Sequence, residues 1–138
     1  MLTVVAAIIE HEGKLLVCQR KRGRNFELMW EFPGGKVESG ETPQAALARE
    51  LQEELGVHAD IGAEIYRTRH QYKELPQAFE LIFLSATIAD PDQVTNLEFE
   101  SIEWRTPDSL LKLNFLSADR ELVRQLATGH LRGNGSAS

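Results

Sequence analysis

The sequence predicts a single domain of the α/β class, in which strands and helices pack in layers. Short apolar runs typical of strands occur on both sides of segments with helical periodicity. The run AFELIFLSATI is apolar on both faces, with Phe79, Leu81 and Phe83 on one and Ile82 and Leu84 on the other. A strand of this kind is expected between two layers. The length of 138 residues suits one domain with a core of its own.

The first elements are expected to be a β-hairpin, a loop and a glycine-rich elbow. TVVAAIIEHEGKLLVCQRK predicts the hairpin, with its turn near residues 11–14, where Gly13 permits positive φ, and its second strand at 15–20. Residues 23–28 are polar and irregular, which indicates a mobile loop. Residues 30–35 then lead into a flexible Pro-Gly-Gly elbow.

A helix with clear ends follows the elbow. Thr42 suits the N-cap, Pro43 the first helical position and Gly56 the position after the last turn. Further strands are expected at residues 61–70 and 99–105, and TPDSLLKL predicts a short helix. SADRELVRQLATGH predicts a C-terminal helix with Ser117 as N-cap and Gly129 as its end. We expect the domain to span residues 1–131 and residues 132–138 to be a disordered tail.

Composition excludes several classes of function. Lys and Arg total 15 and Asp and Glu total 21, so the net charge is 15 − 21 = −6, which argues against binding to nucleic-acid polymers. Cys18 is the single cysteine, so no intrachain disulfide can form and a cytoplasmic setting is expected. The apolar run at residues 4–9 is too short to span a membrane, and no basic segment precedes it as in a signal peptide.

The helix after the elbow carries an unusual cluster of acids. On a helical wheel its leucines fall within about 80° and form the buried side, and its glutamates cluster within about 100° beside them. Glu50 and Glu54 are like charges at i,i+4, which destabilises a helix by a few tenths of a kcal/mol. One interpretation is a solvated face with an Arg49–Glu53 pair. The other is a site for Mg²⁺ or Mn²⁺, which bind carboxylate oxygens. The leucines are Leu47, Leu51 and Leu55, and the glutamates Glu50, Glu53 and Glu54.

The glycines of the elbow have two interpretations as well. Gly34 and Gly35 lack a Cβ atom, so a phosphate or a metal ion can come close to the backbone. A tight turn that needs positive φ would also favour glycine, and both explanations can hold together.

These residues resemble a known family. Gly35, Glu41 and the run RELQEELGV at residues 49–57 have the identities and spacing of the complete Nudix box. WEFPGGKVESGETP is similar to the MutT-like branch, whose members hydrolyse nucleoside triphosphates. The resemblance extends through most of the chain. It implies an α/β/α sandwich around a central mixed sheet, hydrolysis of X-linked nucleoside diphosphates, and dependence on Mg²⁺ or Mn²⁺.

The resemblance also implies roles for individual residues. Glu50, Glu53 and Glu54 would bind metal, with the Gly35 carbonyl as a further ligand and Glu53 as a main one. Glu50 would bind metal or handle the attacking water. Arg49 would orient the glutamates through salt bridges, and Glu41 would be structural, with bonds near the loop.

Residues outside the box complete the predicted site. Glu98, six residues before Trp104, matches a glutamate that MutT-like enzymes often place near the metal as general base or extra ligand; the alternative is an acidic loop residue. Arg20 matches an arginine that contacts the triphosphate; the alternative is a charge at a strand end. Glu31 and Gly34 are further expected substrate contacts.

Asp119 occupies the point where guanine-specific members carry asparagine. An ionised aspartate only accepts hydrogen bonds, so it suits an amino group such as cytosine N4 and puts oxidised-guanine specificity in doubt. The alternative is an acid in the first turn of the last helix, where the dipole favours it. Tyr72 is expected to pack, and so are Trp30 and Phe32, though one of these two could line the base pocket.

Taken together, the sequence predicts Mg²⁺-dependent hydrolysis of nucleoside triphosphates to nucleoside monophosphate and pyrophosphate. The role would be nucleotide-pool sanitation, of the 8-oxo-dGTP or (d)CTP type. The alternatives are a dinucleoside polyphosphate or ADP-ribose hydrolase, and a silent domain that binds a nucleotide or RNA, against which the intact glutamates speak. A nucleotide is the expected partner of a protein without membrane attachment that is a monomer or homodimer.

Overall fold

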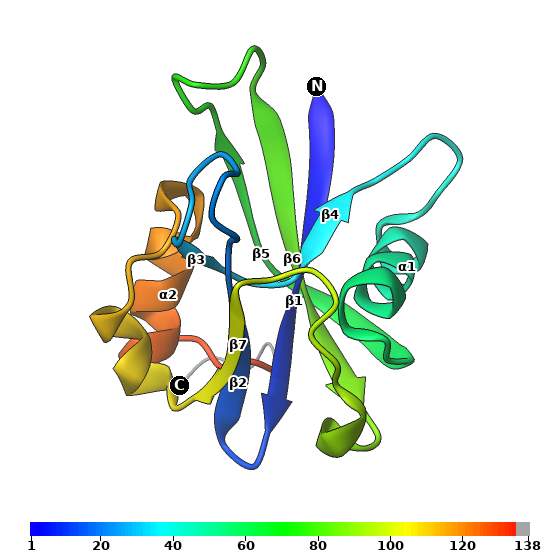
Figure 1. Cartoon of the computed structure of the whole chain (residues 1–138), viewed down its shortest axis with the longest axis vertical. Coiled ribbons are helices and arrows are strands. Elements are labelled where there is room, and N and C mark those ends of the chain that lie inside the picture. Colours follow the sequence, from blue (N-terminus) through cyan, green and yellow to red (C-terminus); the bar gives the residue numbers. More distant parts are fainter. Residues whose placement is uncertain (135–138) are drawn as a thin grey trace.

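The computed structural model describes residues 1–134 and has helices on both sides of a seven-stranded sheet (Figure 1). The α/β fold with a mixed central sheet and flanking helices is therefore confirmed. The strands are β1 Leu2–His11, β2 Lys14–Gln19, β3 Trp30–Glu31, β4 Gly34–Lys36, β5 Ala59–His70, β6 Phe79–Ile88 and β7 Ser101–Arg105. The helices are α1 Pro43–Leu55 and α2 Arg120–Ala127, with 3₁₀ turns η1 Pro91–Gln93, η2 Pro107–Lys112 and η3 Ser117–Asp119.

The sheet is mixed because β1 pairs in parallel with β6 and antiparallel with its other neighbours. Leu2 lies opposite Phe79 and Ile9 opposite Ala86, and β5 continues the sheet antiparallel to β6. On the other edge of β1, β4 pairs with its first half and β2 with its end. Strand β2 in turn pairs with β3 and β7. The hairpin turn has Glu12 and Gly13 at φ 51° and 77°, as two-residue hairpins require.

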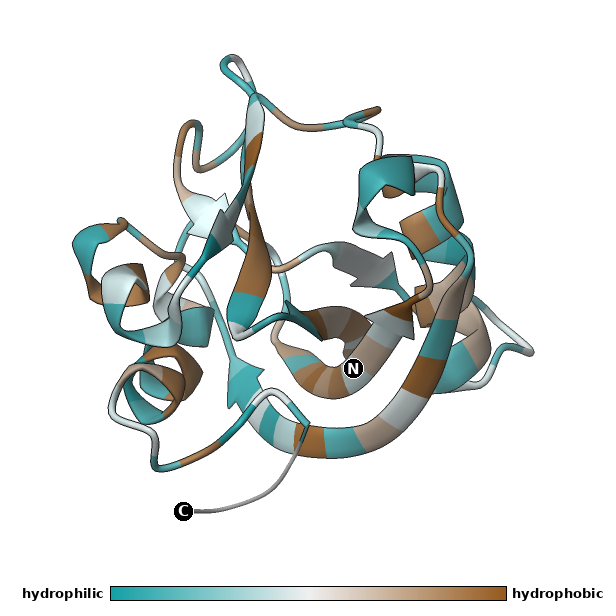
Figure 2. Cartoon of the chain, turned by 90° about the horizontal axis from the view of Figure 1, so that it is seen from below, coloured by the Kyte–Doolittle hydropathy of each residue, from teal (hydrophilic) through white to brown (hydrophobic). Residues whose placement is uncertain are grey.

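Two hydrophobic cores lie on the two faces of the sheet. The alternation predicted for β6 is confirmed, because Ile82 and Leu84 pack in the core on the side of α1, whereas Phe79, Leu81 and Phe83 pack in the core on the side of α2. Figure 2 shows the hydrophobic residues of β1 in the middle of the molecule, between helical segments on both sides. Within residues 1–134 no helix is long and apolar enough to cross a membrane.

The ends of α1 follow the predicted signals. The Thr42 side chain accepts a hydrogen bond from the Ala45 amide, and Pro43 opens the helix. Gly56 follows the last turn at φ 66°, and its amide bonds to the Gln52 carbonyl. These contacts confirm both capping predictions and fix where the acidic side of the helix begins and ends.

The C-terminal part differs from the predictions in detail. Ser117 does not cap α2, because its hydroxyl lies 3.0 Å from His70 Nε2 and the chain first forms the turn η3. β5 starts two residues earlier than expected and β7 two residues later, and η2 is a 3₁₀ helix. Gly133, which falls in the expected tail, is buried beside Ile8 and Leu15. The rest of that tail, residues 135–138, lies outside the described part.

Candidate active site

Helix α1 places its three glutamates in three different environments. Its buried side consists of Leu47, Leu51 and Leu55, as predicted. Glu54 points to strand β4, where it accepts a hydrogen bond of 3.1 Å from the Gly34 amide. Glu50 is mostly buried, whereas the Glu53 side chain is 58% exposed. Within residues 1–134, no three carboxylate, imidazole or thiolate groups are gathered as a preformed metal site.

Arg49 connects the acidic helix to the loop before it. Its Nε and Nη2 atoms donate to the Glu41 carboxylate at 2.8 and 2.9 Å, and Nη2 also donates to the Lys36 carbonyl. Nη1 donates to Glu50 at 3.0 Å and reaches Glu53 at 3.5 Å. The hydrogen bonds from Arg49 lower the pKa of Glu41 to about 2. Arg49 therefore holds Glu50 in place, but its closest partner is Glu41 and not the i,i+4 residue Glu53.

The glycines form a strand rather than the flexible elbow that we expected. A Cβ atom on Gly34 would lie 1.9 Å from the Val5 carbonyl oxygen, because β4 pairs closely with β1. A Cβ atom on Gly35 would lie 2.4 Å from the carboxyl carbon of Glu50. Neither glycine has positive φ, so the interpretation as a tight turn is wrong. Gly34 is needed for strand pairing, and Gly35 makes room for a carboxylate.

Glu54 is the most strongly perturbed carboxyl group of α1. Burial raises its pKa to about 9, and the charges of Glu50, Glu31 and Glu98 add to this effect, which the Gly34 amide partly offsets. Burial also raises the pKa of Glu50, against the effect of Arg49. Several acids thus share one partly buried volume with too little positive charge. An oxygen-rich, electron-rich set of this kind fits a divalent cation such as Mg²⁺ or Mn²⁺.

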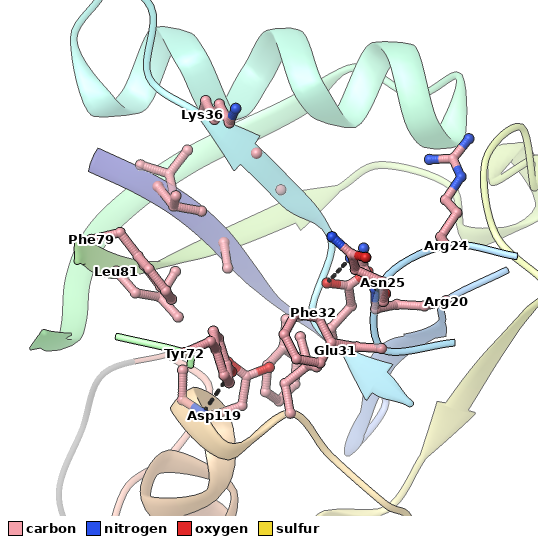
Figure 3. A pocket seen from close by; sticks show the side chains of 18 of the residues that line it. Arg20, Arg24, Asn25, Glu31, Phe32, Lys36, Tyr72, Phe79, Leu81 and Asp119 are labelled. Atoms are coloured by element: carbon pink, nitrogen blue, oxygen red, sulfur yellow. Dashed lines mark hydrogen bonds and ion pairs between the residues drawn. The ribbon is translucent and has the colours of Figure 1, made fainter. Parts of the chain in front are cut away.

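A cavity of about 340 Å³ opens beside Glu54 and Glu98, whereas Glu50 and Glu53 are not among its lining residues. Gly34, Gly35 and Glu54 line one part of it, and the side chains of Phe79 and Leu81 line another. Figure 3 shows the charged groups of Arg20, Arg24 and Glu31 on one side of the cavity and the apolar side chains of Phe79 and Leu81 on the other. The cavity therefore joins a charged part to an apolar part.

Arg20 and Glu31 form a close pair in the wall of the cavity. Arg20 Nη1 donates to both carboxylate oxygens of Glu31 at 3.2 Å, and its Nε donates to the Asn25 carbonyl at 2.8 Å (Figure 3). Burial raises the pKa of Glu31, and Arg20 partly offsets that rise. In this arrangement the guanidinium faces a carboxylate, so the contact of Arg20 with a phosphate stays a prediction.

The irregular loop predicted near residues 23–28 lies over the same cavity. Phe26 and Leu28 both have left-handed backbone angles, at φ 59° and 63°. This conformation is unfavourable for residues with a Cβ atom by roughly 1–2 kcal/mol each. Packing holds the loop, since the Phe26 ring lies 4.7 Å from that of Tyr72. Arg24 of this loop forms an ion pair with Glu98, which also lines the cavity.

Asp119 is buried at the apolar end of the cavity. Within residues 1–134 it is the one charged residue that is buried in the core. Burial raises its pKa well above the usual range and the charge of Glu31 adds to this, whereas a backbone hydrogen bond from Phe32 acts in the opposite direction. Burial therefore disfavours the ionised form of Asp119, the form on which the expectation of a group that only accepts hydrogen bonds depends. A carboxylic acid donates as well as accepts.

Sequence reasoning missed several residues of the cavity. Tyr72 was expected only to pack, but it lines the cavity, and its hydroxyl accepts a hydrogen bond from the Ala118 amide at 2.9 Å. Arg24, Asn25 and Phe26 belong to the irregular loop and also line the cavity. No periodicity marks such a loop, although its basic run RKRGR was a signal of charge near the site. Of the two aromatic candidates for the pocket, Phe32 lines it.

Comparisons with known proteins agree with this architecture. Residues 1–126, which include the acidic helix and the cavity, match the family described as NUDIX domain. The chain is 40% identical over 126 residues to the CTP pyrophosphohydrolase of Escherichia coli K12, with 89% of each chain covered. It is 41% identical over 93 residues to the 8-oxo-dGTP diphosphatase of Haemophilus influenzae, which covers 66% of this chain and 68% of the other.

The solved structures give the same result. The MutT protein of methicillin-resistant Staphylococcus aureus 252, described as a Nudix hydrolase, superposes with a TM-score of 0.72 at 38% identity. That comparison covers 92% of this chain and 95% of the other. The chain therefore belongs to the Nudix family, and its predicted resemblance to the MutT-like branch is confirmed.

Proposed function

We propose that the protein hydrolyses nucleoside triphosphates to nucleoside monophosphate and pyrophosphate. The substrates are of the CTP or 8-oxo-dGTP type, as in the relatives at about 40% identity. The reaction depends on Mg²⁺ or Mn²⁺ and takes place in the cytoplasm, where it serves nucleotide-pool sanitation. The protein acts on free nucleotides as a monomer or homodimer.

The observation that carries this proposal is the continuity of the cavity. Glu54, Gly34 and Gly35 line its charged part, and Phe32 and Asp119 line the part that can receive a base. A nucleoside triphosphate has the same two halves, an anionic chain and a flat ring system. Its phosphates need positive charge in the acidic compartment, which a divalent cation provides.

The metal would be held by the carboxylates of Glu50, Glu53, Glu54 and Glu98 and by the Gly35 carbonyl. When bound, Mg²⁺ neutralises phosphate oxygens and lowers the pKa of water that it binds. A water molecule adds to one phosphorus atom, the phosphoanhydride bond breaks, and the carboxylate of Glu50 or Glu98 takes the proton.

Arg49 contributes by position rather than by contact with the substrate. Its guanidinium is held by Glu41 and the Lys36 carbonyl and donates to Glu50. This network keeps the Glu50 carboxylate in the space that a side chain at position 35 would fill. A carboxylate fixed in this way loses little conformational entropy when it acts.

Asp119 is proposed to contact the base. Its carboxyl group can accept from the amino group of cytosine, and its protonated form, which burial favours, can also donate to a carbonyl oxygen. The original reason to expect a preference for cytosine is thus weaker, and both cytosine and 8-oxoguanine edges fit the group. Contacts of this type discriminate between bases by a few kcal/mol when they are buried.

A substrate panel tests the proposed function. The purified chain is incubated with CTP, dCTP, dGTP, 8-oxo-dGTP, a dinucleoside tetraphosphate and ADP-ribose, with and without Mg²⁺, and the nucleotide products, pyrophosphate and phosphate are quantified. We expect pyrophosphate release from the triphosphates only with metal. Cleavage of the dinucleoside tetraphosphate or of ADP-ribose alone would assign the protein to another Nudix branch, and nucleotide binding without any cleavage would identify a silent domain.

A further inference from the structure

The ion pair between Arg24 and Glu98 connects two loops that lie 74 residues apart in the chain. Arg24 Nη1 donates to Glu98 Oε1, and both side chains line the active-site cavity together with Glu54. The loop carrying Arg24 has a second tie to this region, because the Arg22 amide donates to the Glu100 carboxylate. Figure 3 shows Arg24 extending away from Arg20 and Glu31.

Arg24 differs from the other arginine of the cavity in how firmly it is held. Arg20 is enclosed by both oxygens of Glu31 and by the Asn25 carbonyl, and its side chain is 27% exposed. The Arg24 side chain is 54% exposed, and among residues 1–134 its ion-pair partner is Glu98. An exposed pair of this kind is weak and is readily exchanged for a stronger partner.

We propose that Arg24 is an exchangeable counter-ion of the active site. In the nucleotide-free protein it holds Glu98, and when the divalent cation takes Glu98 the guanidinium transfers to the polyphosphate of the substrate. This inference rests on the proposed hydrolysis of nucleoside triphosphates and adds a binding residue and an order of events to it.

Charge balance supports the exchange. Without metal, Glu98 faces the same cavity as Glu54 and Glu31, and Arg24 limits the repulsion among them. A divalent cation held by Glu98 would supply more positive charge than the guanidinium, and Arg24 would then lose its partner. The freed guanidinium then lies beside an incoming anionic chain, and its planar set of N–H donors matches phosphate oxygens in a two-point contact.

The first test measures metal binding without nucleotide. Mn²⁺ affinity is determined by electron paramagnetic resonance for the wild type, Arg24→Gln and the matched control Arg22→Gln, which removes the same charge from the same loop. Because Arg24 competes with the metal for Glu98, Arg24→Gln is expected to bind Mn²⁺ about two- to fivefold more tightly than the control does. This range corresponds to the free energy that an exposed ion pair typically contributes. In a Glu98→Gln background this difference should vanish.

The second test measures the other half of the exchange. Binding of the Mn²⁺–tripolyphosphate complex, which has no base or sugar, is measured by titration calorimetry. Arg24→Gln should weaken this binding about tenfold or more relative to Arg22→Gln, since a charge-assisted hydrogen bond to phosphate is lost.

Equal behaviour of Arg24→Gln and Arg22→Gln in either measurement overturns the proposal. So does a gain in Mn²⁺ affinity that persists in the Glu98→Gln background, because the effect would then not pass through Glu98. A wild-type protein that binds no Mn²⁺ and cleaves no triphosphate would instead refute the proposed function, so the two failures are distinguishable.

Discussion

The buried acid Asp119 should make the stability of this protein depend on pH in a way that one substitution removes. Asp119 is 3% exposed, and burial raises its pKa well above the ordinary range. In the unfolded chain an aspartate ionises at a pKa of about 3.9. Between these two values the folded state binds one proton more than the unfolded state. The resulting penalty is absent below the unfolded pKa and grows as pH rises toward the folded one.

The magnitude follows from the slope alone. Each pH unit over which folded Asp119 keeps its proton costs about 1.4 kcal/mol of unfolding free energy. The penalty therefore grows with pH at about this rate from the unfolded pKa up to the folded one. The asparagine introduced by Asp119→Asn has no proton to lose, and its amide oxygen can still accept the hydrogen bond from Phe32. The stability of Asp119→Asn relative to wild type should therefore rise with pH, by about 1.4 kcal/mol for each pH unit between the unfolded and the folded pKa of Asp119.

The assay is urea and thermal unfolding of both proteins at pH 5, 6 and 7 in metal-free buffer. Partly buried acids such as Glu31 and Glu54 are present in both proteins, so only the difference between the two is interpreted. A difference in unfolding free energy that stays constant with pH would show that Asp119 is ionised in the folded protein. This result would refute the argument from burial, and Asp119 would again be expected only to accept hydrogen bonds.

Three further predictions address the acidic and basic groups of the site. Glu53→Gln should lower kcat by several orders of magnitude with an unchanged Tm, because the side chain is exposed; retention of more than a tenth of kcat at saturating Mg²⁺ would contradict its assignment. Gly34→Ala should lose about 3–5 kcal/mol of stability or fail to fold, because the new methyl group would clash with the backbone of β1. Gly35→Ala should stay folded and lose activity, because the methyl group would displace the Glu50 carboxylate. Chemical denaturation and kcat measurements distinguish the two variants, and a Gly34→Ala protein of wild-type stability would contradict the predicted clash. Arg20→Ala should lower kcat/KM more for a triphosphate than for the matching diphosphate, because a guanidinium can bind phosphate oxygens through two hydrogen bonds; equal losses would show that Arg20 only holds Glu31 in the wall of the cavity.

Much of the fold was predictable because its signals are local. Thr42 and Gly56 lie directly beside the helix turns whose free amides and carbonyls they satisfy. The two apolar faces of β6 can be predicted without knowing its neighbouring strands, because adjacent residues of a strand point to opposite faces. The acidic cluster of α1 was visible for the same reason.

The rest depends on contacts between residues far apart in the chain. Gly34 is required by Val5, which no spacing rule connects to it, and the ion pair of Arg24 with Glu98 arises only when two loops meet. The raised pKa of Asp119 is a consequence of burial, and a sequence shows the residue type but not its exposure. Ser117 was misassigned as a cap because its hydroxyl has a tertiary partner.

The parallel pairing of β1 with β6 has a consequence for biosynthesis. The paired residues Leu2 and Phe79 are separated by 79 − 2 = 77 positions, so β1 leaves the ribosome long before its central neighbour exists. At the usual elongation rates this interval is roughly 4–15 s. During that time one edge of a largely apolar strand is open to solvent and to pairing with other chains. A nascent chain arrested before residue 79 should therefore be sensitive to proteases and bound by chaperones, and should become resistant once β6 has emerged.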